Sequence, residues 1–266
     1  MVSETSGFKG ALRKRLTVEQ IDHLKRLYRR SQHAWLRTLH SKDLRRMGDA
    51  FAAGKYDWYY PAYERHFGAL RDRRLNILEI GIGGYDTSAA GGGSLRMWEC
   101  YFPHAKIYGL DIYDKSPHDA GRVRTFRGSQ ADESFLRTMV QQIGPIDIVI
   151  DDGSHINEHV RKSFDVLFPL VADNGIYVIE DTHSSYWESF GGSSTDLKRD
   201  DTGLGLVKGL LDALNHREIR DPLRQPGPFD STVVELHCYH NIVFIQKGHN
   251  VTVCALGADA EDGQDR

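Results

Sequence analysis

Short apolar runs alternate with amphipathic stretches along the chain from residue 75 onward. The apolar runs have the length and bounding polar residues of buried strands, and they predict five strands, at 75–80, 106–111, 122–126, 146–151 and 175–180. The stretches between them carry helical spacing and predict helices near 93–101, 132–142, 157–170 and 204–216. Strands alternating with helices are typical of βα units that form a mostly parallel sheet covered on both faces.

The last two apolar runs, at 231–238 and 241–247, are separated only by Tyr239 and His240. So short a connection predicts an antiparallel hairpin. The predicted fold class is therefore α/β and Rossmann-like, with a mostly parallel seven-stranded sheet that ends in a C-terminal antiparallel hairpin. Five parallel strands closed by a hairpin are unusual for a dinucleotide-dependent dehydrogenase.

The residues before the first strand have a different character. Thr17–Gln20 has the form of a capping box, and Ile21, Leu24, Leu27 and Tyr28 follow at helical spacing, which predicts that a helix begins there. A polar segment follows, and then a cluster of aromatic residues: Tyr56, Trp58, Tyr59, Tyr60, Tyr63 and Phe67. Such a cluster packs in a core or covers one, and the alternative is a surface on which a ligand stacks.

Length and composition fit one large domain with modest appendages, because the chain has 266 residues, of which 40% are hydrophobic and 27% charged. We predict a basic helical extension over 1–55, one α/β domain over 56–256 and a disordered acidic tail over 257–266. The formal net charge of -3 indicates no nucleic-acid partner. Residues 1–50 hold twelve Lys and Arg against five Asp and Glu, which marks either a polyanionic partner or a solvated helix face.

The cysteines and the start of the chain bear on its compartment. Cys100, Cys238 and Cys254 are far apart and odd in number, so they indicate neither a disulfide framework nor a CxxC metal site. The first thirty residues lack the apolar core of a signal peptide, and no stretch approaches the roughly 18 apolar residues that span a bilayer. We expect a cytoplasmic protein without a membrane span.

A glycine turn follows the first predicted strand, in the sequence LEIGIGG that ends at Gly84. Glycines at this place let the backbone approach a ligand and turn sharply toward a helix. A dinucleotide fingerprint requires another glycine three residues after Gly83, where this chain has Asp86, so pyrophosphate binding is not indicated. Glu79 would repel phosphate but would attract the cationic end of a zwitterionic ligand.

Two further polar segments follow the next strands. Asp111 ends the second strand, where its carboxylate can accept both ribose hydroxyls of an adenosine, or can serve only as a helix cap or an exposed turn acid. Arg127–Asp132 follows the third strand, where its polar groups either face an adenine edge or only cap the next helix.

Acidic residues follow the fourth and fifth strands. The fourth runs into Asp151, Asp152 and His155, and the fifth into Glu180 and Asp181. Parallel strands deliver their carboxyl ends to the same sheet edge, where ligands of open α/β sheets bind. Carboxylates packed this closely repel one another unless a cation joins them. We therefore predict an all-oxygen metal site for Mg²⁺, in which Mn²⁺ can substitute, formed by Asp152, Glu180 and Asp181.

His155 is the predicted general base. It lies three residues after Asp152, and an unperturbed histidine has a pKa of about 6.5, which suits proton abstraction near neutral pH. The alternative is an exposed loop histidine, and neither Asp151 nor His183 receives a firm role. The segment 184–192 combines aromatic residues with glycines, so it either folds over a carbohydrate or is an ordinary surface loop.

The order and spacing of five segments, LEIGIGG, GLDIY, RGSQAD, DIVIDDGSH and YVIEDTHSSYW, resemble class I S-adenosylmethionine-dependent methyltransferases. Within that class the chain is similar to macrolide-sugar O-methyltransferases, and to related enzymes that methylate sugars of glycolipids and polysaccharides. The resemblance covers residues 60–247. The glycine-rich loop over 87–94 departs from the family pattern.

The resemblance implies a metal-dependent O-methyltransferase that acts on a sugar hydroxyl of a glycoside, glycolipid or polysaccharide, and a homo-oligomer. It assigns metal ligation to Asp152, Glu180 and Asp181, and the general base to His155. It assigns S-adenosylmethionine binding to Glu79, Gly81, Gly83, Asp111, Ser129 and Gln130. Two alternatives stay open: methylation of a catechol-type aromatic hydroxyl, and a noncatalytic S-adenosylmethionine-binding subunit.

Overall fold

The computed structural model describes residues 43–252 continuously and, before them, positions 17, 20, 23–24, 27–28, 31, 34–36 and 38. The predicted tail over 257–266 lies outside the described residues. Thr17 and Gln20 exchange the two hydrogen bonds of a capping box, because the Thr17 N–H donates to Gln20 Oε1 at 2.9 Å and the Gln20 N–H to Thr17 Oγ1 at 3.2 Å. The described positions from 20 to 38 are helical, which confirms the predicted start of a helix.

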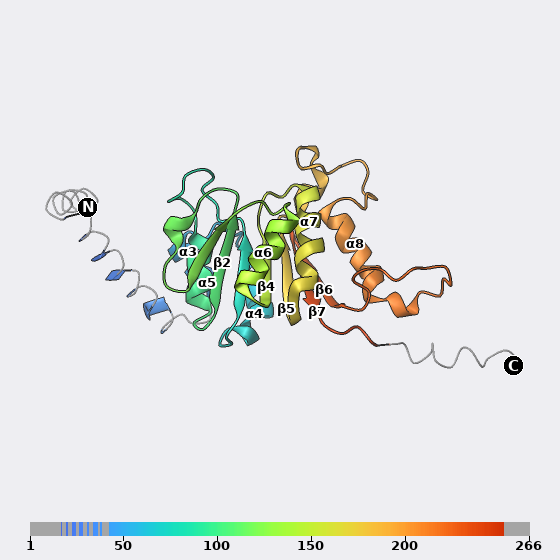
Figure 1. The fold of residues 1–266 in the computed structure, drawn as a ribbon, viewed down its shortest axis with the longest axis horizontal. Helices are drawn as coiled ribbons and strands as arrows, with labels where there is room; N and C mark the ends of the chain where they lie inside the picture. Colours follow the sequence, from blue (N-terminus) through green and yellow to red (C-terminus); the bar gives the residue numbers. More distant parts are fainter. Residues whose placement is uncertain are drawn as a thin grey trace, which may run out of the picture.

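Seven strands form one sheet in the order β3-β2-β1-β4-β5-β7-β6 (Figure 1). Strands β1 to β5 are parallel, and β7 runs antiparallel to both β5 and β6. Their bounds are β1 Asn76–Ile80, β2 Lys106–Asp111, β3 Val123–Arg127, β4 Ile146–Asp151, β5 Val171–Glu180, β6 Val233–Tyr239 and β7 Ile242–Lys247. The predicted fold class, including the closing hairpin, is confirmed.

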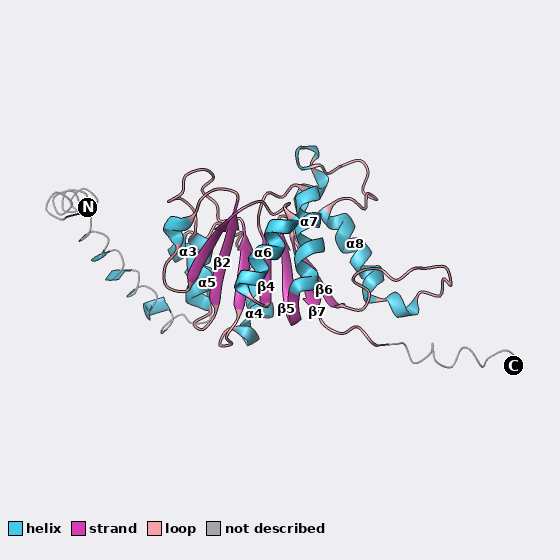
Figure 2. Cartoon of the chain, viewed as in Figure 1, coloured by secondary structure: helices cyan, strands magenta, loops and turns pink. Residues whose placement is uncertain are grey.

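Helices cover both faces of the sheet (Figure 2). Their bounds are α3 Leu44–Phe51, α4 Tyr60–Phe67, α5 Gly93–Tyr101, α6 Glu133–Ile143, α7 Asn157–Leu167 and α8 Gly203–Leu214. One hydrophobic core joins the sheet to α3, α4 and α5, and the other joins it to α6, α7 and α8. Among the described residues, none of the helices has the length and apolar character needed to cross a bilayer.

The aromatic cluster before β1 belongs mostly to the first of these cores. Tyr59, Tyr60, Tyr63 and Phe67 are buried, and the rings of Tyr63 and Phe67 pack against Trp98 and Phe244. The two other members, Tyr56 and Trp58, are exposed and stack on each other with ring centroids 4.5 Å apart. Burial of aromatic surface therefore holds α4 against the sheet.

Four elements differ from the predicted ones, each for a local reason. Helices α3 and α4 form in the segment read as polar and aromatic, since Asp43 caps the first and Pro61 occupies the first turn of the second. Strand β5 begins at Val171 rather than at 175, because Asn174 takes a left-handed φ of 62° and the pairing with β4 shifts register there. Helix α7 ends at Leu167, before Pro169.

Candidate active site

The glycine turn after β1 lies directly against the end of β4. Gly81 has a φ of 89°, and a Cβ on it would lie 2.0 Å from the carbonyl oxygen of Asp152. Only glycine fits this position, because a side chain would collide with backbone. The Asp152 N–H donates to the carbonyl of Ile80 at 3.0 Å. These contacts bring the predicted cofactor turn and the predicted metal acids to one point of the sheet edge.

Asp111, at the end of β2, is tied to the same turn. Its Oδ2 accepts a hydrogen bond from the Ile82 N–H at 3.0 Å, and its Oδ1 accepts one from the Tyr113 N–H at 2.9 Å. Each carboxylate oxygen has a second lone pair, so the half-buried Asp111 retains capacity to accept ribose hydroxyls. Ser129 lies half-buried after β3, and its hydroxyl accepts from the Ala131 N–H at 3.1 Å.

Gln130 is buried and its amide is used inside the protein. Its Nε2 donates to Asp151 Oδ1 at 3.1 Å, and its Oε1 accepts from the Ser154 N–H at 2.8 Å. Asp151 is also buried and accepts from the Ser163 hydroxyl at 2.6 Å, and burial raises the pKa of its carboxyl. Both side chains therefore brace the loop that carries His155.

Glu79 lies beneath the glycine turn and has no exposed surface. Its Oε2 accepts from the Ser94 hydroxyl at 2.7 Å, and its Oε1 lies 2.9 Å from Lys55 Nζ. The carboxylate is therefore held from within, by the first turn of α5 and by a lysine that the sequence analysis did not single out.

Lys55 is the centre of this arrangement. Its Nζ also lies 2.7 Å from Asp152 Oδ2 and 2.6 Å from Glu180 Oε1. Burial alone would lower the pKa of Lys55, but the attraction of Asp152, Glu180 and Glu79 outweighs it and raises that pKa well above the usual value. Lys55 is therefore an ammonium that neutralises part of a buried acidic cluster.

Two tyrosines before and within α4 hold the remaining acids. The Tyr63 hydroxyl donates to Glu180 Oε1, and the Tyr59 hydroxyl donates to Asp181 Oδ1 at 2.7 Å. Burial, followed by the negative charge of Asp152, raises the pKa of Glu180, while Lys55 and Tyr63 oppose that rise.

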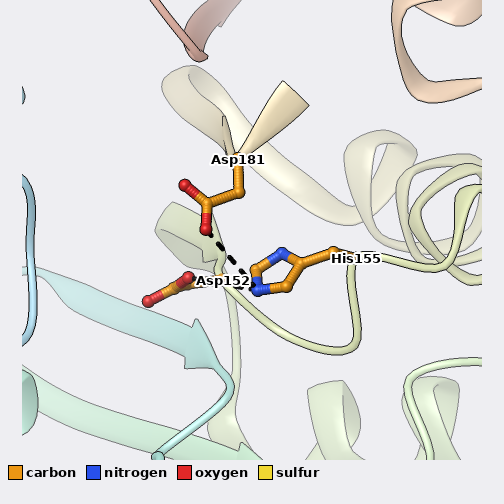
Figure 3. A group of neighbouring side chains, drawn as sticks. All are labelled: Asp152, His155 and Asp181. Atoms are coloured by element: carbon orange, nitrogen blue, oxygen red, sulfur yellow. Dashed lines mark ion pairs between the residues drawn. The ribbon is translucent and has the colours of Figure 1, made fainter. Parts of the chain in front are cut away.

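His155 faces two of the carboxylates. Its Nε2 lies 3.8 Å from Asp152 Oδ1 and 3.8 Å from Asp181 Oδ2, and Figure 3 shows the imidazole pointing between the two acids. Both His155 and Asp181 adopt left-handed backbone angles, with φ values of 57° and 54°. Such strained positions concentrate at functional sites, where the surrounding structure must hold them.

The acids and His155 form two groups that share Asp152. We call Asp152, His155 and Asp181 the outer group, and Glu79, Asp152 and Glu180 the inner group; in each, one ligand atom per residue lies within 4.8 Å of the others. The three predicted metal ligands are thus divided, with Glu180 in the inner group and Asp181 in the outer.

The donor set fits a hard divalent cation, which prefers carboxylate oxygen. In each predicted ligand, the side chains of Lys55, Tyr59 or Tyr63 contact one carboxylate oxygen and not the other. Lys55 holds Oδ2 of Asp152 and, with Tyr63, Oε1 of Glu180, whereas Tyr59 holds Oδ1 of Asp181. The second oxygens are Oδ1 of Asp152, Oε2 of Glu180 and Oδ2 of Asp181.

The aromatic loop after β5 is anchored next to His155. Buried Asn157 donates to the carbonyls of Ser184 and Phe190, at 3.1 and 2.9 Å, and accepts from the Gly203 N–H at 2.8 Å. The Phe190 ring lies 6.4 Å from the His155 ring, while Trp187 is exposed. The segment 184–192 therefore packs beside the predicted base.

Comparisons with known proteins point to one group of enzymes, although no model of a protein family matches the chain. The chain is 52% identical over 198 residues to mycinamicin VI 2''-O-methyltransferase of Micromonospora griseorubida, which covers 74% of this chain and 50% of that protein. It is 53% identical over 198 residues to demethylmacrocin O-methyltransferase of Streptomyces fradiae, with the same shares of each. The chain spans about half the length of these relatives.

Solved structures give the same result. The MycE methyltransferase from the mycinamycin biosynthetic pathway, in complex with Mg and SAH, matches with a TM-score of 0.76 and 49% identity, over 79% of this chain and 55% of that one. A MycE complex with Mg, SAH and mycinamycin VI matches with a TM-score of 0.76 and 46% identity, over 80% of this chain and 56% of that one.

Proposed function

This chain is a homologue of the sugar O-methyltransferases over 74% of its length, and on that premise we propose that it moves a methyl group from S-adenosylmethionine to a sugar hydroxyl with the aid of a divalent cation. One observation carries the proposal: the outer group, with an imidazole between two carboxylates, lies at the glycine turn through the contact of Gly81 with Asp152. The matched MycE structures contain Mg and SAH.

The acceptor class is supported by the names of the relatives. The curated relatives named above act on macrolides, and another, 47% identical over 208 residues and 76% of this chain, is a 2'-O-methyltransferase of a rhamnosyl tetracenomycin from Streptomyces olivaceus. A sugar hydroxyl of a glycoside, glycolipid or polysaccharide is therefore the proposed acceptor, in preference to a catechol.

The donor would lie across the glycine turn. In this proposal Asp111 accepts the ribose hydroxyls, and Gly81 and Gly83 let the backbone approach the donor closely. Ser129 borders the adenine side. Glu79 and Gln130, whose polar atoms are occupied inside the protein, support the turn and the loop of His155 from behind. S-adenosylmethionine, when bound, supplies a methyl group attached to a positively charged sulfur. That sulfur leaves as a neutral thioether, which is a good leaving group.

Asp152, Glu180 and Asp181 are the proposed metal ligands, through the oxygens that their internal donors leave free. Mg²⁺ suits this oxygen-rich set, and Mn²⁺ can replace it. A divalent cation supplies a Lewis acid that lowers the pKa of an acceptor hydroxyl and fixes its orientation. Glu180 belongs to the inner group, so in this assignment its Oε2 would have to reach the cation past the shared Asp152.

His155 is the proposed general base. Its Nε2 takes the proton of the acceptor hydroxyl as the oxygen bonds to the methyl carbon and the bond from that carbon to sulfur breaks, so the products are a methyl ether and a neutral thioether. The carboxylates of Asp152 and Asp181, each with one oxygen 3.8 Å from Nε2, keep the imidazole beside the proposed cation.

Compartment and assembly are also part of this proposal. The thiols of Cys100 and Cys238 are free, which agrees with a reducing cytoplasm. A homo-oligomer is the proposed assembly, and size-exclusion chromatography with light scattering measures it directly.

The test is methyl transfer from labelled S-adenosylmethionine to glycosides with two neighbouring hydroxyls, to their deoxy counterparts and to catechol, with and without a chelator. We expect chelator-sensitive transfer to the glycosides. His155→Ala should lower kcat by about 10²–10⁴-fold with nearly normal donor affinity, whereas Asp111→Ala should weaken donor binding first. Transfer that a chelator does not affect would exclude the metal, and an unchanged rate in His155→Ala would exclude the base.

A further inference from the structure

The inner group already contains a cation. Lys55 Nζ lies between 2.6 and 2.9 Å from one oxygen each of Glu79, Asp152 and Glu180. The side chains of Lys55, Glu79 and Glu180 are 1%, 0% and 2% exposed. By contrast, Asp152, His155 and Asp181 of the outer group are 28%, 25% and 19% exposed. The inner group is thus filled and closed, and the outer group is open to solvent.

The inner group has the composition of a metal site in its own right. Its three carboxylates come within 4.8 Å of one another, and carboxylate oxygens are the preferred ligands of Mg²⁺ and Mn²⁺. Two buried carboxylates and a part-buried one at this distance require a compensating positive charge. Either a divalent cation or a lysine ammonium can supply this charge, and the two would compete for the same carboxylate oxygens.

The backbone before Lys55 keeps the ammonium in place. Ala52 and Gly54 adopt left-handed angles, with φ values of 51° and 75°, which turn the chain from α3 toward the sheet edge. A Cβ on Gly93 would lie 2.2 Å from the carbonyl oxygen of Ala52, so this turn packs directly on the first turn of α5. Lys55 thus follows a turn that packs directly against α5.

We propose that Lys55 is a positioning residue, whose ammonium is a tethered cation that fills the inner group and confines the divalent cation to the outer side of the shared Asp152. The inference rests on the proposed metal dependence. It explains why the four clustered carboxylates, those of Glu79, Asp152, Glu180 and Asp181, would form one metal site and not two. Lys55 turns Oδ2 of Asp152 inward, which leaves Oδ1 on the side of His155. Without the ammonium, Oδ2 is free to bind a second cation with Glu79 and Glu180.

The experiment counts bound Mn²⁺ per chain. The signal of free aqueous Mn²⁺ in electron paramagnetic resonance is titrated with the full-length wild type, Lys55→Met and Lys55→Arg, each stripped of metal beforehand. Lys55→Met removes the charge and keeps an unbranched side chain of nearly the same length, so we expect two Mn²⁺ instead of one. Lys55→Arg keeps the charge and should bind one. Lys55→Met combined with Glu79→Gln removes a carboxylate from the inner group and should return the count to one.

A second measurement covers the case in which Lys55→Met is poorly folded without metal. The melting temperature of Lys55→Met and of the milder Lys55→Gln is followed as MnCl₂ increases, with wild type as the reference. Because a second cation would replace the ammonium, both variants should gain more in melting temperature from Mn²⁺ than the wild type does. A purely structural role of Lys55 predicts a lower melting temperature that Mn²⁺ does not restore.

The outcomes separate this inference from the proposed function. One Mn²⁺ in Lys55→Met, with the affinity of wild type and without extra stabilisation by Mn²⁺, overturns the role of Lys55, while chelator-sensitive methyl transfer by the wild type would stand. A wild type that binds no Mn²⁺ overturns both the metal dependence and the role of Lys55. Two Mn²⁺ in the wild type also contradict the inference, because the inner group would then not be closed.

Discussion

Tyr59→Phe tests whether α4 orients the metal acids. The Tyr59 hydroxyl donates to Asp181 Oδ1 at 2.7 Å and accepts from the Asp181 N–H at 3.3 Å. It therefore holds both the side chain and the backbone of a residue in a strained left-handed conformation. The hydroxyl also bonds to the carbonyl of Asn241 at 2.9 Å. Tyr59→Phe keeps the aromatic ring and deletes these three hydrogen bonds.

The cost follows from the kind of bond and its burial. A hydrogen bond to a charged group contributes about 1.5–3 kcal/mol. Tyr59 is fully buried but the Asp181 side chain is 19% exposed, so water replaces part of what is lost. We expect a loss near 2 kcal/mol, which for a domain of this size lowers the melting temperature by about 4–8 °C. Removal of an outer partner of a metal ligand typically weakens metal binding by about 10–100-fold.

The assay measures melting temperature and the Mg²⁺ concentration that gives half-maximal methyl transfer. Tyr177→Phe is the matched control, since the Tyr177 hydroxyl donates to buried Asp151 at 3.3 Å, away from the outer group. Both variants should lose stability, but only Tyr59→Phe should require more Mg²⁺. An equal Mg²⁺ requirement in the two variants would refute the orienting role of Tyr59.

Two further predictions concern the glycine turn and acid stability. Gly81→Ala should cost at least about 1–3 kcal/mol of stability and abolish S-adenosylhomocysteine binding in calorimetry, because the Cβ would lie 2.0 Å from the Asp152 carbonyl; wild-type affinity would contradict it. Burial, with the nearby charges of His237 and Arg65, lowers the pKa of His66 to about 4. In this pH range His66 binds a proton in the unfolded chain but not in the folded one. The free energy of unfolding should therefore fall as pH falls from about 6.5 to 4. His66→Phe keeps an aromatic ring stacked on Phe244 and should reduce the dependence of the melting temperature on pH in this range. An unchanged dependence would exclude His66 as the group responsible.

The sheet could be predicted from the sequence because its signals are local. Strands β2 and β4 have the predicted bounds of 106–111 and 146–151, and the hairpin of β6 and β7 lies within two residues of its predicted position. A parallel strand that is buried on both faces consists of consecutive apolar residues, so it can be recognised in the sequence. Two strands joined by a short connection can pair only as a hairpin. Since the strands are parallel, their order along the chain also brought the acids after β4 and β5 to one edge.

The contacts of the polar side chains could not be predicted in the same way. Gln130 was predicted to bind S-adenosylmethionine and Asp151 received no firm role, and the sequence did not indicate that the two hydrogen-bond to each other. Glu79 was also predicted to bind S-adenosylmethionine, and the sequence did not indicate its ion pair with Lys55. Sequence position places a residue at the sheet edge, but a rotation about one bond decides whether its carboxylate faces out or in.

The residues whose contacts with the acids the sequence did not indicate share one segment and one spacing. Lys55, Tyr59 and Tyr63 are four positions apart, and their partners Asp152, Glu180 and Asp181 follow about a hundred residues later. The aromatic pattern correctly indicated burial, but it carries no information on where a buried hydroxyl finds its acceptor. Because the Tyr63 ring packs on Trp98 and Phe244, the same burial that stabilises α4 sets the direction of the Tyr63 hydroxyl. The packing of this segment and the orientation of the acids are therefore linked. The hydrogen-bond donors of the segment occupy one oxygen of each of these acids, and they thereby determine which oxygens remain for a cation.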